Sequence, residues 1–83
     1  MPAAEALGAW WVGREEYSKA RAAFQQALAA APGDYAALYG EGLAEEHLGL
    51  LPDALKHLQK ACRIAPDSAS CKRELDTVQK KIR

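Results

Sequence analysis

Two glutamates stand out as residues whose type and spacing could do chemistry. Glu41 and Glu45 are four positions apart, so a helix would place both carboxylates on one face. Such a pair can bind a metal ion or transfer a proton. It can also belong to a helix that is rotated slightly, so that Leu38 and Leu43 do the packing. We favour the second interpretation, because one acidic pair without further ligands does not make a metal site.

The two histidines do not complete a site. His47 and His57 fall in different predicted helices, and the repeat register described below puts His57 on an outer face, where an imidazole is expected to be solvated. No glycine-rich phosphate loop, nucleophile elbow or HExxH motif occurs in the chain. The sequence therefore predicts that the protein is not an enzyme and has no cofactor and no metal.

Cys62 and Cys71 are the only cysteines, too few for a disulfide scaffold, and their spacing fits no zinc motif. On neighbouring helices they could lie close together. The favoured interpretation is that both are small apolar side chains in a helix interface. A disulfide between them is left open, since it requires an oxidising compartment and nothing in the sequence signals export.

The composition indicates a small globular protein without a strong charge. The 83 residues include 11 Lys and Arg and 11 Asp and Glu, so the formal net charge is +0, and 49% of them are hydrophobic. This balance disfavours nucleic acid and anionic membranes as partners. No apolar run approaches the ~20 residues of a membrane span, and no signal peptide is recognisable, so a cytoplasmic location is expected. The enrichment in alanine and arginine is typical of a GC-rich bacterial gene.

The last segment of the chain is more basic than the rest, with Lys72, Arg73, Lys80, Lys81 and Arg83. Such a segment could contact RNA or anionic lipid. No aromatic residues alternate with these cations, as they do in proteins that bind single-stranded nucleic acid. We favour a solvated helix whose cations also suit the dipole at its C-terminus.

Helices must position all of these residues, because alanine is abundant and Val, Ile and Thr are scarce. Pro32 and Pro66 begin two clusters of helix-breaking residues, and each cluster supplies an N-cap candidate: Asp34 in the first, and Asp67 or Ser68 in the second. The predicted helices span residues 2–13, 17–31, 35–48, 52–64 and 69–82.

The two prolines are 34 positions apart, and other residues recur at the same interval. A helix–turn–helix unit of this length resembles the tetratricopeptide repeat. The first copy holds the pattern residues Leu7, Gly8, Trp11, Tyr17, Ala20, Phe24, Ala27 and Pro32, and the second holds Leu38, Gly42, Leu51, Ala54, Leu58, Ala61 and Pro66.

The resemblance implies an all-α fold, a right-handed superhelical array of five helices in a single domain. Residues 1–34 and 35–68 would be the two repeats, and 69–83 would be the solvating helix that commonly follows the last repeat. Gly8 and Ala20, like their counterparts in the second repeat, would let paired helices cross closely. One repeat cannot bury its apolar face alone, so neighbouring repeats must stack.

The resemblance also implies a concave binding groove, lined by the first helix of each repeat and by the final helix. The residues at these groove positions are Glu5, Ala9, Val12, Tyr39, Leu43, Glu46, His47 and Arg73. The subclass that grips C-terminal carboxylates has Lys and Asn where this chain has Glu5, Ala9 and Gly40, so that mode is not expected.

This groove would be apolar with an acidic rim formed by Glu5 and Glu46. Such a surface suits an apolar peptide segment or an amphipathic helix with a basic residue, with Tyr39 as the anchor. The predicted function is therefore an adaptor or scaffold that binds another protein. The alternative for Val12 and Leu43 is that they only pack locally.

Two adjacent tryptophans offer a second candidate surface. Trp11 falls at the family's aromatic position and is expected in the core, whereas Trp10 falls where the second helix of a preceding repeat would pack. Either Trp10 folds back on its own repeat, or this face meets another subunit or further repeats. A module that forms a homodimer through Trp10 or the groove face is therefore the alternative function.

Overall fold

Five helices make up residues 4–82, the part of the chain that the computed structural model describes. They are α1 (Ala4–Gly13), α2 (Tyr17–Ala30), α3 (Tyr35–Leu48), α4 (Leu51–Ile64) and α5 (Ala69–Ile82). The all-α prediction is confirmed, and the predicted boundaries agree to within one residue wherever they can be compared. The predicted start of the first helix at residue 2 lies outside the described residues.

Capping side chains explain where α3 and α5 begin. Asp34 Oδ1 accepts a hydrogen bond from the backbone N–H of Ala36 at 3.0 Å. Of the two candidates for the cap of α5, Ser68 and not Asp67 is the one used, because Ser68 Oγ accepts a hydrogen bond from the backbone N–H of Cys71 at 3.2 Å. At the other end of α3, Gly49 adopts a left-handed conformation with φ of 80° and closes the last turn.

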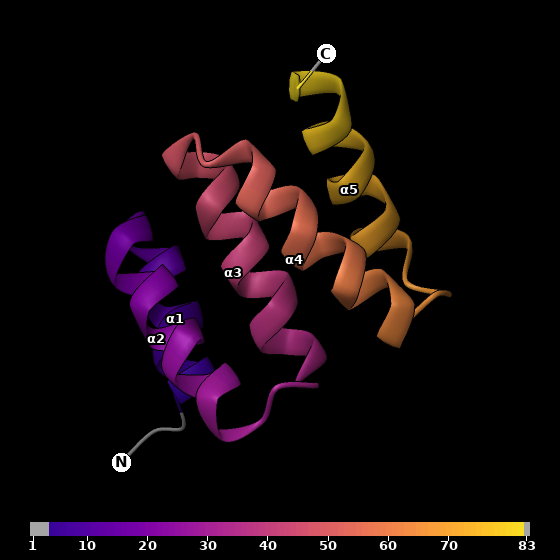
Figure 1. Ribbon diagram of the computed structural model, residues 1–83. Coiled ribbons are helices and arrows are strands. Elements are labelled where there is room, and N and C mark those ends of the chain that lie inside the picture. The colour runs from indigo at the N-terminus through magenta and orange to yellow at the C-terminus, as the bar shows by residue number, and fades with distance from the viewer. Residues whose placement is uncertain (1–3, 83) are drawn as a thin grey trace.

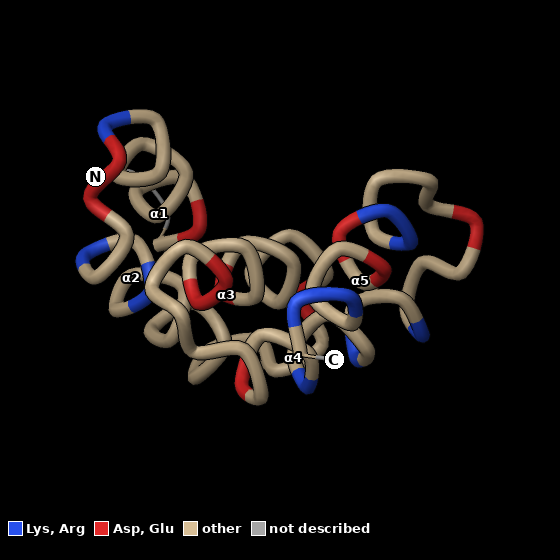
Figure 2. Tube along the Cα trace, turned by 90° about the horizontal axis from the view of Figure 1, so that it is seen from above, with Lys and Arg blue, Asp and Glu red and all other residues tan. Residues whose placement is uncertain are grey.

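The helices follow one another back and forth along the chain, each packed against the next (Figure 1). In addition, α1 contacts α3, and α3 contacts α5. Figure 2 shows that the array is curved, with α1, α3 and α5 along the inside of the curve and α2 and α4 outside. The concave side of the molecule therefore belongs to the odd-numbered helices.

Phe24 of α2 fills the space between α1 and α3. Its side chain is almost fully buried, at 3% exposure. A Cβ atom at Gly8 would lie 2.7 Å from the ring carbons of Phe24, and one at Gly40 would overlap the same ring. The sequence pattern paired Gly8 with Ala20, but the ring of Phe24, one turn further along α2, is the nearest group because it extends into this gap.

The corresponding contact in the second repeat joins α3 to α4. A Cβ at Gly42 would lie 2.7 Å from Leu58 Cγ and 3.4 Å from the backbone oxygen of Ala54, which confirms the predicted close crossing. Leu58 is fully buried, and Val78 of α5 belongs to the same apolar cluster. The last helix therefore covers the apolar face that α4 would otherwise expose.

Candidate functional site

A cleft of about 340 Å³ lies between α1 and α3 on the concave side. We call it the concave cleft. Of the predicted groove residues, Glu5, Ala9, Val12, Tyr39 and Leu43 all line it. The remaining lining residues are Ala6, Phe24, Ala36 and Gly40. The structure thus brings predicted positions from both repeats together around one opening.

Small residues account for the depth of the concave cleft. Alanines on α1 and α3, together with Gly40, leave room between the two helices, and the ring of Phe24 closes the cleft from the α2 side. The larger side chains Val12, Tyr39 and Leu43 remain only half-buried around this space. The cleft therefore offers an apolar surface that no residue within 4–82 covers.

Tyr39 is the largest polar-tipped side chain at the concave cleft. Its ring stacks near that of Tyr35, with 6.0 Å between the centroids. Burial raises the pKa of Tyr39, and the carboxylate of Glu74 adds to the effect, so the phenol is neutral at ordinary pH. An aromatic ring held in this way, with a hydroxyl that can donate a hydrogen bond, suits an anchoring role.

The other predicted groove residues do not reach the concave cleft. Glu46 is buried and its carboxylate accepts a hydrogen bond from Lys81 Nζ at 3.0 Å. His47 is exposed and stacks on Tyr17, with 4.2 Å between the ring centroids. Arg73 is an exposed residue of α5. The acidic rim predicted from Glu5 and Glu46 is thus one-sided, because only Glu5 borders the cleft.

The tryptophan pair lies on α1. Trp10 is 53% exposed, and it meets Trp11 edge to face with 4.7 Å between the ring centroids. The guanidinium of Arg14 lies 4.7 Å from the centre of the Trp10 ring. Trp11, which was expected in the core, packs against the core cluster that contains Phe24 but is only half-buried.

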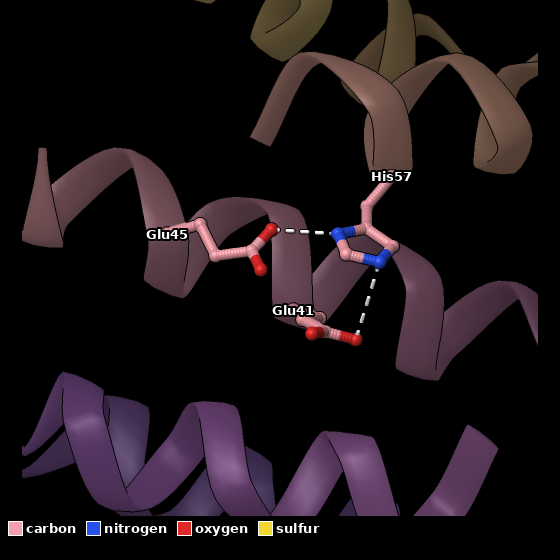
Figure 3. A group of neighbouring side chains, drawn as sticks. All are labelled: Glu41, Glu45 and His57. Carbon is pink, nitrogen blue, oxygen red and sulfur yellow. Dashed lines mark hydrogen bonds and ion pairs between the residues drawn. The ribbon is translucent and has the colours of Figure 1, made fainter. Parts of the chain in front are cut away.

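Behind α3, on the side away from the concave cleft, four charged side chains meet. This charged cluster consists of Arg21 from α2, Glu41 and Glu45 from α3, and His57 from α4. Arg21 Nε donates to Glu45 at 2.9 Å, and His57 Nδ1 lies 2.7 Å from the same carboxylate. His57 Nε2 lies 3.6 Å from Glu41 (Figure 3).

The charged cluster overturns two predictions. Glu41 and Glu45 are not rotated out of the packing but are 2% and 0% exposed. His57 is not solvated but half-buried between the two carboxylates. Two acidic residues at packed positions require cationic partners on the adjoining helices. A search of α2 and α4 for such cations would have included Arg21 and His57, together with other basic residues such as Lys19 and Lys60.

Mutual interactions shift the ionisation of the charged cluster. The hydrogen bond to Glu45 raises the pKa of His57 and outweighs the opposing effect of burial. Burial by itself would raise the pKa of Glu45, but the hydrogen bonds from His57 and Arg21 lower it overall. Burial raises the pKa of Glu41. The raised pKa of His57 favours its charged form, and the lowered pKa of Glu45 favours the carboxylate, so the two shifts reinforce this ion pair.

The composition of the charged cluster also invites comparison with a metal centre. Ligand atoms of Glu41, Glu45 and His57 all lie within 4.8 Å of one another. These atoms are already engaged, because Arg21 bonds to Glu45 and each imidazole nitrogen faces a carboxylate. A neighbouring hollow of about 310 Å³ is lined by Lys60, a further cation. The arrangement fits an internal ion-pair network better than a metal centre.

Cys62 of α4 and Cys71 of α5 form a disulfide, with 5.7 Å between their Cα atoms. The favoured interpretation of two free apolar thiols is therefore wrong. The turn that joins α4 to α5 brings the two side chains into bonding distance, which their spacing in the sequence does not reveal. The bond ties the last helix to the second repeat.

Comparison with known protein families assigns the chain to one of them. The family model described as the tetratricopeptide repeat matches residues 12–69, which is more than half of the chain. A search of the curated proteins finds no match. Among the helices formed by residues 4–82, none is long and apolar enough to cross a membrane. With its 34-residue helical pairs and its curved array, the chain belongs to the tetratricopeptide repeat family, whose members are protein–protein interaction modules.

Proposed function

We propose that this protein is an adaptor or scaffold module that binds an apolar peptide segment or an amphipathic helix of another protein in the concave cleft. The observation that supports this most directly is the cleft itself, a hollow of about 340 Å³ whose walls are mainly apolar. Amphipathic helices bind such surfaces by laying their apolar face into a groove.

The walls of the concave cleft are suited to this mode of binding. Val12 on α1 and Leu43 on α3 supply aliphatic contacts, and Tyr39 supplies an aromatic one. Aromatic residues at the centre of an interface commonly contribute most of the binding energy. The stacking of Tyr39 near Tyr35 limits the freedom of its ring, which lowers the entropy lost on binding.

A selection experiment tests the proposal. Helical peptides are selected from a displayed library against the wild-type protein, and their affinity is measured by fluorescence anisotropy. Tyr39→Ala is expected to weaken binding by about tenfold or more, and Leu43→Ala by less. The matched control is Leu48→Ala, which truncates an exposed leucine of the same helix outside the concave cleft.

Circular dichroism confirms that each variant is folded. The groove assignment fails if Tyr39→Ala and Leu43→Ala both leave the affinity unchanged while the selected peptides still bind. It also fails if the control weakens binding as much as Tyr39→Ala does.

A homodimer is the second candidate function, and the exposure of Trp10 favours it. A large aromatic side chain that is half open to solvent on an alanine-rich helix is typical of an interface. Sedimentation equilibrium over a wide concentration range distinguishes the two candidates. A dimer that Trp10→Ala returns to monomer supports self-association through this face. A monomer at all concentrations leaves the concave cleft for a different protein.

A further inference from the structure

The concave cleft has an acidic end, which lies where α1 and α3 begin. Glu5, in the first turn of α1, lines the concave cleft and also a second hollow of about 360 Å³. Asp34, the N-cap of α3, lines this second hollow together with alanines of α2. Glu5 thus borders the apolar cleft, with Asp34 beside it in the second hollow, and we call these two carboxyl groups the acidic pair.

The acidic pair has no cation of its own within residues 4–82. Neither Glu5 nor Asp34 forms a salt bridge with a lysine or arginine of that range, whereas Glu46, the other predicted rim residue, bonds to Lys81. A side-chain hydrogen bond with Asp34 raises the pKa of Glu5, and the negative charge of Asp34 adds to the effect. A cation placed beside the two carboxyl groups would offset the repulsion between their charges.

We propose that the occupant of the concave cleft is an amphipathic helix that carries a lysine or arginine at one edge, and that Glu5 and Asp34 bind this cation. This inference rests on the proposed function and adds the chemistry of the partner. The charge complementarity is one-sided, since Glu46 is bonded to Lys81 and does not line the concave cleft. A basic residue is therefore expected at the Glu5 end of the partner and not at the end near Leu43.

The geometry of α1 also predicts the spacing in the partner. Glu5 and Val12 are seven residues apart on α1, which corresponds to about 10 Å along the helix axis. A partner helix lying along this cleft would carry its basic residue about two turns from the apolar residue that contacts Val12 and Leu43.

The test uses the helical peptides selected against the wild-type protein. Selection is expected to enrich Lys or Arg at one position, about two turns from an apolar residue. A peptide with Lys at this position is then compared with the same peptide carrying Gln there. Both peptides are titrated against the wild-type protein and against the double variant Glu5→Gln, Asp34→Asn. The asparagine retains the capping ability of Asp34, so the fold of α3 is preserved.

The double variant is expected to weaken binding of the Lys peptide by about fivefold at low salt, and to leave binding of the Gln peptide unchanged. The difference should shrink at high ionic strength. Asp67→Asn is the matched control, because Asp67 is an exposed carboxylate in the equivalent turn before α5, and it should affect neither peptide.

Two results overturn the inference: no enrichment of basic residues, or an equal loss of affinity for both peptides. The Tyr39→Ala variant shows whether such a result contradicts only this inference or also the proposed function. If Tyr39→Ala weakens both peptides and the double variant weakens neither, the concave cleft binds the peptides but the acidic pair does not. If Tyr39→Ala also has no effect, the concave cleft is not the binding site.

Discussion

One face of α3 is apolar and borders the concave cleft, whereas the opposite face is charged and pairs with neighbouring helices. On one face Tyr39 and Leu43 border the concave cleft, and on the other Glu41 and Glu45 meet Arg21 and His57. The charged face is satisfied internally, and within residues 4–82 no buried side-chain nitrogen or oxygen lacks a hydrogen-bond partner. On the apolar face, no side chain within residues 4–82 covers the concave cleft. Charged residues that suggest chemistry in the sequence here hold helices together, and apolar residues leave the open surface for which we propose a partner.

Removing Glu45 is expected to have the largest effect on stability. Glu45→Ala removes the carboxylate that Arg21 and His57 share and leaves them only longer contacts with Glu41 and Asp53. Because these contacts remain, the expected cost is about 3 kcal/mol, at the lower end for breaking a buried pair. Urea denaturation measures the loss. Glu16→Ala is the control, since Glu16 is exposed and its side chain makes no capping bond. A loss below about 1 kcal/mol for Glu45→Ala would mean that the charged cluster is solvated and not structural.

Reducing the disulfide is expected to cost somewhat less. It closes a loop of sequence separation 9, for which the chain-entropy relation gives about 2–3 kcal/mol. Urea denaturation with and without a phosphine reductant measures the difference, and a Cys62→Ala variant should not respond to reductant. Because the bond ties α5 to α4 and not α3 to its neighbours, its effect should add to that of Glu45→Ala. If the two losses of stability are strongly non-additive, the disulfide and the Glu45 ion pairs stabilise the same contact between helices.

Gly40→Ala tests the apolar face of α3. The added methyl group would overlap the ring of Phe24, and overpacking of a core costs about 1–3 kcal/mol. Because the ring of Phe24 lines the concave cleft, a displacement of the ring would change the shape of the cleft, and peptide binding should also weaken. Gly13→Ala is the matched control, because a Cβ there meets no atom within 4 Å. Equal stability of the two variants would contradict the packing of Phe24 described above.

The pH dependence of stability is the smallest expected effect. His57 has its pKa raised above the ordinary 6.5, so its contribution is complete below that pH and is lost as pH rises through the folded-state pKa. Glu45 has its pKa lowered below the ordinary 4.5, so its contribution is present above that pH and is lost as pH falls. Glu41, with its pKa raised by burial, also favours the folded state at lower pH.

The contributions of His57 and Glu45 should therefore both be complete between about pH 4.5 and pH 6.5, with His57 losing its contribution above this range and Glu45 below it, while Glu41 tilts the optimum toward the acidic side. His57→Gln is expected to flatten the decline above this range, as measured by urea midpoints at several pH values. The control is His47→Gln, which removes an exposed imidazole outside the charged cluster. If the His57→Gln variant loses stability with rising pH as steeply as the wild type, groups other than His57 cause that loss.

Much of the fold could be predicted from local signals. The caps at Asp34 and Ser68 depend on hydrogen bonds to residues two or three positions away, which a sequence displays directly. The 34-residue period likewise placed Ala9 and Leu43 at equivalent positions of the two repeats, and both line the concave cleft. That this cleft binds a partner stays a prediction.

The candidate site was less predictable where distant side chains decide the outcome. Glu46 and His47 occupy groove positions in the sequence, but Lys81 and Tyr17 hold them elsewhere. The acidic pair depends on Asp34, whose place beside Glu5 in the second hollow does not follow from its local role as the cap of α3. Contacts between helices that are far apart in the sequence decided each of these positions.

The sequence by itself determined the helices, their order and their repeat, because helix propensity, caps and periodic small residues act over a few positions of the chain. Tertiary structure alone decided that Glu41, Glu45, Arg21 and His57 neutralise one another, and that Cys62 and Cys71 are bonded. The reason is physical: the cost of burying a charge, and the distance between two thiols, are set by helix packing and not by local spacing.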